Sequence, residues 1–192
     1  MIDALLNVVP PPDHPFEAYA APWEQMEKAI GTVLPQDYKE FVRQYGCGYF
    51  MKFLKIYVPV SEYKYRRIIP HIRDIEYYIG PIEGSGYVCW PNPGGLIPFG
   101  QTDNGDRLFW LAQGAPDDWP VIVWDRGDQK FERFDCDMTT FLAGLASDEI
   151  LPAGFPDDLF PCTLFAPSKP RVPRRPSWQI KLSLRLAAPA IW

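Results

Sequence analysis

Apolar residues recur every three or four positions in two segments near the start of the chain, which is the spacing of one face of an α-helix. Proline opens each segment and glycine closes it, so the sequence predicts helices over residues 22–31 and 35–46. Two successive helices with no strand between them argue against a parallel α/β start and favour segregated helices and strands. The apolar positions of the two stripes are Trp23, Met26, Ala29 and Ile30, then Tyr38, Phe41, Val42 and Tyr45.

Strand signals take over in the middle of the chain. β-Branched and aromatic residues predict a strand over residues 50–58 and a short one over 87–90. The isoleucines of residues 61–79 favour a helix, in which Pro70 demands a start or a break. Asp137 is placed to cap a last helix, which carries apolar residues at helical spacing.

Two hairpins are the clearest prediction. Residues 103–106 contain the Asn-Gly pair typical of a tight turn, and residues 125–128 form a second polar turn between apolar runs. Strands joined by such short turns pair antiparallel. The four strands expected are residues 96–99, 107–111, 120–124 and 130–134.

Both ends of the chain are rich in proline and lack helical spacing. Residues 1–21 are expected to be a leader that lies on the domain, residues 22–147 the domain itself, and residues 148–192 an extended arm. Within the arm, residues 178–186 alternate strictly between apolar and polar, which predicts a terminal edge strand.

The charge is distributed unevenly along the chain. The net charge is −5, but the last acidic residue is Asp158 and six basic residues follow it. Residues 1–158 therefore carry 13 basic and 24 acidic groups, or −11. An acidic body with a basic tail disfavours nucleic acid as a partner and favours rapid encounter with a basic protein.

Few residues offer catalytic or metal chemistry. The cysteines lie at least 26 positions apart (162 minus 136), which excludes zinc and redox spacings. The two histidines, His14 and His71, have no recognisable nucleophile nearby, and no nucleotide-binding glycine loop is present. No signal peptide or membrane-spanning stretch is recognisable, so we expect a cytoplasmic protein without catalytic residues, cofactor or metal.

Four short segments occur in an ordered series along the predicted domain. They are Leu34–Phe41 with the closing Tyr45–Gly48, Leu96–Gly100, Pro120–Asp125 and Thr140–Leu142. This series resembles the SUKH superfamily, which contains fungal cell-wall assembly regulators and bacterial immunity proteins of polymorphic toxin systems. The resemblance runs from about residue 23 to residue 145.

The resemblance implies a single α+β domain, with a mainly antiparallel sheet wrapped by helices and no catalytic machinery, that acts by holding another protein. Together with the acidic body, it predicts a non-enzymatic immunity protein that covers the active face of a toxin effector such as a basic nuclease. Neither a nucleic acid nor a membrane is expected as a partner. The expected contact residues are Asp103, Asp106, Trp110, Asp117, Asp118, Trp119, Asp125 and Asp128.

Other interpretations of the same residues stay open. The protein is alternatively a regulatory scaffold of the cell-wall regulator type, which recruits partners through residues 148–192. The aspartates are also compatible with acid–base or metal chemistry, although their preference for turns explains them more simply. For the tryptophans, filling a sheet face is simpler than anchoring a partner.

Overall fold

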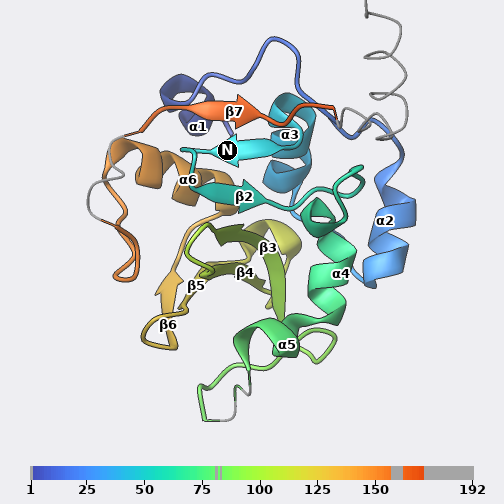
Figure 1. Cartoon of the computed structure of the whole chain (residues 1–192). Coiled ribbons are helices and arrows are strands. Elements are labelled where there is room, and N and C mark those ends of the chain that lie inside the picture. The colour runs from blue at the N-terminus through green and yellow to red at the C-terminus, as the bar shows by residue number, and fades with distance from the viewer. Residues whose placement is uncertain (1, 81, 83, 157–161, 171–192) are drawn as a thin grey trace, which may run out of the picture.

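The computed structural model describes residues 2–80, 82, 84–156 and 162–170, and this part of the chain forms α-helices and one seven-stranded sheet (Figure 1). The helices are α1 (Asp3–Val8), α2 (Trp23–Ile30), α3 (Gln36–Tyr45), α4 (Ile68–Arg73), α5 (Ile75–Ile79) and α6 (Met138–Ser147), with 3-10 helices η1 (Lys64–Arg66) and η2 (Pro116–Asp118). The strands are β1 (Gly48–Phe50), β2 (Leu54–Ile56), β3 (Leu96–Thr102), β4 (Arg107–Leu111), β5 (Val121–Asp125), β6 (Lys130–Phe134) and β7 (Phe165–Pro167).

Adjacent strands of the described sheet run antiparallel, in the order β6-β5-β4-β3-β2-β1-β7. Both predicted hairpins are confirmed, as β3–β4 with Leu96 opposite Leu111 and β5–β6 with Val121 opposite Phe134. The predicted α+β class with a mainly antiparallel sheet is therefore confirmed.

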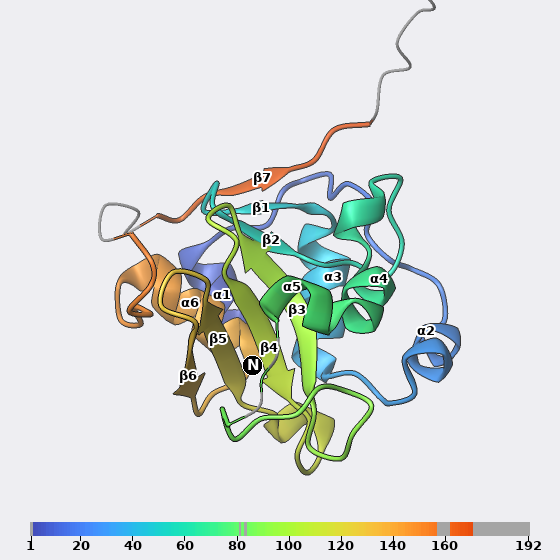
Figure 2. The same cartoon turned by 60° about the horizontal axis from the view of Figure 1, so that its bottom comes forward.

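Both faces of the sheet are covered. Successive residues of a strand point to opposite faces. On β4, Leu108 and Trp110 belong to the larger core cluster, whereas Phe109 and Leu111 belong to a second one. Figure 2 shows α5 in front of β3 and β4, with α1, α3 and α6 behind the sheet. Burial on both sides explains why β4 reads as a continuous apolar run.

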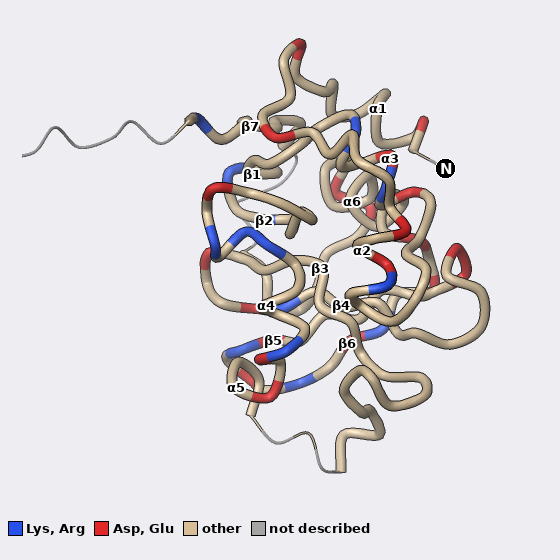
Figure 3. The backbone as a smooth tube through the Cα atoms, turned by 90° about the vertical axis from the view of Figure 1, so that its right-hand side faces the viewer, with Lys and Arg blue, Asp and Glu red and all other residues tan. Residues whose placement is uncertain are grey.

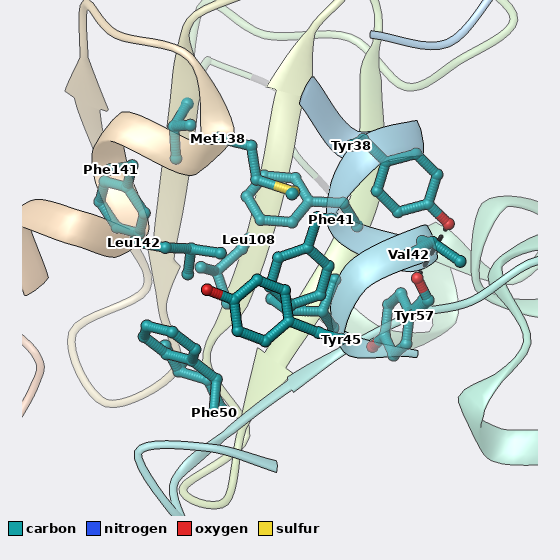
Figure 4. Close-up of a cluster of buried hydrophobic side chains, with 14 of the residues drawn as sticks. Tyr38, Phe41, Val42, Tyr45, Phe50, Tyr57, Leu108, Met138, Phe141 and Leu142 are labelled. Atoms are coloured by element: carbon teal, nitrogen blue, oxygen red, sulfur yellow. Dashed lines mark hydrogen bonds between the residues drawn. The ribbon is translucent and has the colours of Figure 1, made fainter. Parts of the chain in front are cut away.

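The larger core lies between the sheet and helices α3 and α6 (Figure 4). The four apolar residues of the predicted α3 stripe are all fully buried. Their two tyrosines keep the hydroxyls hydrogen-bonded: Tyr38 Oη donates to Tyr57 O at 2.9 Å, and Tyr45 Oη donates to Val9 O at 2.5 Å. Because an unpaired buried hydroxyl is costly, these bonds let α3 bury a mixed aromatic face.

The first residues of the chain build the core, contrary to the expectation of a surface leader. Leu5 of α1 and the following Val9 are fully buried, and α1 packs against α6. A six-residue helix offers too few positions for a recognisable period, so its buried face is decided by the distant α6.

The domain also extends past its expected end at residue 147. Phe155 is 4% exposed and packs on Phe53 with ring centroids 5.4 Å apart. β7 joins the sheet beside β1, so part of the expected arm belongs to the fold. The terminal strand predicted over residues 178–186 lies outside the described residues.

Two strand predictions differ from the structure. The strand expected over residues 50–58 is divided, because Met51 and Lys52 adopt positive φ angles of 56° and turn the chain between β1 and β2. Around residues 87–90 the chain makes one isolated bridge, Cys89 with Leu96, in place of a strand. Local composition predicts extended backbone but not where a ladder is available.

Candidate protein-binding site

The expected contact residues do not form one surface, because they lie at two ends of the sheet. Consecutive turns of an antiparallel meander alternate between opposite ends. Turns 103–106 and 125–128 share one end, where the Arg126 N–H donates to Asp106 Oδ1 at 3.1 Å. Residues 117–118 follow β4 at the other end, roughly 17 Å away for a five-residue strand.

Both expected tryptophan anchors are buried. Trp110 is 0% exposed, with its ring 5.0 Å from Tyr38 and 4.7 Å from Phe99, and Trp119 is 4% exposed. Both rings pack in the larger core between the sheet and helices α3 and α6, as the simpler interpretation predicts. We therefore remove Trp110 and Trp119 from the candidate contact surface.

Asp106 is not a contact residue either, because its side chain is 2% exposed and organises its own hairpin. Its Oδ2 accepts the Thr102 hydroxyl at 2.6 Å, and its backbone N–H donates to Thr102 Oγ1 at 3.0 Å. The carboxylate also accepts the backbone N–H of Arg126. Asp106 thus ties two turns together within the chain and has no side free for a partner.

The remaining turn aspartates at this end have partners within the chain. Asp103 forms an ion pair with Lys55, and Asp128 forms one with Lys130 at 2.9 Å. Asp125 Oδ1 accepts the N–H of the turn residue two positions later, at 2.7 Å. Neighbouring cations therefore balance part of the negative charge at this end.

The other end of the sheet has an acidic groove of about 480 Å³ between α1, α3, η2 and the start of α6. Asp117 lies in it, whereas Asp118, the next residue in sequence, is exposed and does not line it. Figure 3 shows acidic positions where α1, α3 and α6 meet, with basic positions beside them. The residues that line the groove are Ile2, Asp3, Gln36, Asp37, Glu40, Asp117 and Asp137, of which five are acidic and none is Lys or Arg.

Helix starts hold three of these carboxylates in place. Asp37 accepts the Tyr38 N–H at 2.7 Å through Oδ1 and the Thr139 N–H at 2.8 Å through Oδ2, which links α3 to α6. Asp137 caps α6 by accepting the Thr140 N–H at 2.7 Å, as predicted. Backbone N–H groups at helix starts favour carboxylates.

Asp117 plays the same part for α3 from outside the helix. Its Oδ1 accepts the Gln36 N–H at 2.6 Å, across 81 positions of sequence. The short helix η2 that carries Asp117 thereby docks on the first turn of α3. The groove consequently has a preorganised wall of carboxylates in which side-chain freedom is already lost.

Burial and neighbouring charge set the protonation of the groove. The pKa of Asp37 is raised to about 6, mainly by burial and to a smaller extent by the charge of Asp137, with the N–H of Thr139 offsetting part of the rise. Burial also opposes ionisation of Asp137, but the hydrogen bonds from Thr140 and Thr139, together with the positive charge of the amino terminus, outweigh burial and lower its pKa. Arg43 forms an ion pair with Glu40 and balances its charge. At neutral pH the groove is therefore an anionic site through its other four carboxylates, and it is suited to a Lys or Arg side chain.

Four of the five groove carboxylates, namely Asp3, Asp37, Glu40 and Asp137, were missed as candidate site residues. From the sequence, Asp37 and Asp137 are residues that favour helix starts. The sequence does not indicate whether those two helix starts lie side by side. Only the packing of α1 and α3 against α6 brings them together. A search for acidic residues at successive helix starts would find Asp3, Asp37 and Asp137, but not Glu40, which is the fifth residue of α3.

Two further properties of the described residues bear on the site. No group of three or more His, Cys, Asp or Glu side chains in this part of the chain is arranged to hold a metal ion. None of its helices is long and apolar enough to cross a membrane.

Comparison with known proteins identifies the family. The family model SUKH_6, described as SMI1-KNR4 cell-wall, matches residues 21–142. No curated protein and no solved structure matches the chain. The matched region runs from just before α2 into α6 and includes six of the seven strands, so α1 and β7 lie outside it. Because the match covers more than half of the 192 residues, the chain belongs to the SUKH family.

Proposed function

We propose that this protein is a non-enzymatic immunity protein that neutralises a toxin effector by covering a cationic surface of that effector. The carrying observation is the groove, which is lined by five carboxylates and no Lys or Arg. Membership of a family that includes immunity proteins supports a protein as the occupant.

The groove is suited to a basic side chain for three reasons. Its carboxylates are already held by backbone N–H groups, so little ordering accompanies binding. Ile2 adds apolar surface on which the aliphatic stem of a Lys or Arg can lie. A basic nuclease presents such side chains where it grips phosphate, and carboxylates placed there block it.

Paired charge-neutralising variants test the proposal. Asp3→Asn with Glu40→Gln removes two groove charges and the ion pair between Glu40 and Arg43, and it leaves the bonds to the α3 and α6 backbone intact. Asp103→Asn with Asp128→Asn removes two charges at the opposite end of the sheet and is the matched control. Each variant is co-expressed with the effector encoded beside the gene, and growth and affinity are measured.

We expect the groove variant to lose about tenfold or more in affinity, and to lose protection, while the control stays within about threefold. Affinity of the wild type should fall as salt rises. Equal losses in both variants would mean that only net charge matters. Unchanged binding in the groove variant, at an unchanged unfolding midpoint, contradicts the proposal.

A truncation distinguishes this proposal from the regulatory scaffold. Removing residues 148–192 would delete Phe155 and β7, which belong to the folded domain. Removing only residues 171–192 spares both. An immunity protein that binds through the groove keeps its affinity after this truncation, whereas a scaffold that recruits through residues 171–192 of the arm loses its partner.

A further inference from the structure

The β1 edge of the sheet is completed by a strand that the matched family region, ending at residue 142, does not include. β7 pairs with β1 over three residues. Two backbone bonds flank this ladder: the Met51 N–H donates to Leu164 O at 2.7 Å, and the Ser168 N–H donates to Cys47 O at 2.9 Å. A strand edge that pairs through main-chain hydrogen bonds can bind any extended segment of suitable shape.

One side chain anchors the segment in a built socket. Phe165 is 8% exposed, with its ring 5.1 Å from Tyr45 and 6.2 Å from Phe41. Gly48 forms the floor, since a Cβ there would lie 2.3 Å from Phe165 Cζ. The adjoining Leu164 is 41% exposed, so the aromatic ring supplies most of the burial.

We infer that the β1 edge is an acceptor site for an extended segment with an aromatic anchor, and that residues 164–168 of a second copy of this chain occupy it in exchange for the chain's own. The paired residues Gly48 and Pro167 are 119 positions apart (167 minus 48). The site is therefore assembled without local connectivity to its occupant. An exchanged segment makes every contact that the resident one makes.

The covalent connection of β7 to its own chain determines whether its own segment or that of a second copy occupies the site. A strand of the same chain acts at an effective concentration of roughly millimolar order, so exchange is favoured at high concentration or when the resident strand is weakened. Phe155 anchors the chain nine positions before Leu164 (164 minus 155).

Two complementary variants of the full chain test the exchange. Gly48→Ala blocks the acceptor and keeps the donor, whereas Phe165→Ala weakens the donor and keeps the acceptor. Each variant alone should be monomeric in native mass spectrometry. Their mixture should contain a heterodimer with one intact β1–β7 pairing, because the Gly48→Ala chain donates to the Phe165→Ala chain.

A peptide supplies the second measurement. A fluorescent peptide of residues 162–170 should bind the Phe165→Ala chain at least about tenfold more tightly than the same peptide with alanine in place of Phe165. It should not bind a chain that also carries Gly48→Ala. If Phe165→Ala does not fold, Phe165→Leu takes its place in both experiments. A mixture that stays monomeric, or a peptide that binds regardless of either substitution, overturns the inference.

Discussion

Asp37 makes a quantitative prediction about stability and pH. Burial raises its pKa to about 6, from an ordinary value of 3.8. The folded chain therefore holds this proton more tightly than the unfolded chain. Below pH 3.8 both states are protonated at this site, and as the pH rises towards 6 the unfolded state releases its proton first. The free energy of unfolding must consequently fall across this window and stay lower above it.

The size of the effect follows from the two pKa values. Each factor of ten in proton affinity corresponds to about 1.4 kcal/mol, so the difference amounts to about 2 to 3 kcal/mol. Asp37→Asn cannot titrate and removes the effect. The amide oxygen can accept only one of the two N–H groups that Asp37 accepts, which adds a constant cost of about 1 to 3 kcal/mol.

Urea unfolding followed by tryptophan fluorescence, from pH 3.5 to 7.5, measures both chains. The free energy of the wild type minus that of Asp37→Asn should fall by about 2 to 3 kcal/mol as the pH rises, because the other titrating groups cancel in the difference. A difference that is flat, or that rises with pH, refutes the reasoning. It would mean that the N–H groups of α3 and α6 favour the carboxylate more than burial disfavours it.

The remaining predictions concern other buried groups. Burial lowers the pKa of His71, so stability should fall as the pH drops below about 6.5, and His71→Gln should reduce that fall in the same urea series. Asp106→Ala should cost about 2 kcal/mol, because it strands buried donors, whereas Asp128→Ala, which breaks an exposed pair, should cost less than about 1 kcal/mol by urea midpoint. Gly46 has a φ of 65°, and a Cβ there would lie 2.3 Å from Phe16 O, so Gly46→Ala should lower stability by at least about 2 kcal/mol in thermal unfolding. A loss below about 0.5 kcal/mol for Gly46→Ala would contradict the close approach of the two backbone segments.

The local sequence pattern was sufficient to predict an element wherever its conformation depends on residues within that element. The α3 stripe, the Asn-Gly turn and the Asp137 cap are short-range features, and each was predicted in place. Pattern failed where the partner is distant. α1 is buried by α6, and β7 is paired by β1, neither of which is a neighbour in sequence.

The candidate site shows the same division. The sequence by itself determined the acidic body, the helix starts that carry carboxylates and the antiparallel hairpins, because these depend on composition and on contacts a few residues apart. Tertiary structure alone decided that Trp110 is covered, that the acidic turns face opposite ends, and that Asp37, Asp117 and Asp137 converge in one groove. The physical reason is that burial and convergence depend on how α1, α3 and α6 pack on the sheet, which is set by contacts between residues far apart in the chain.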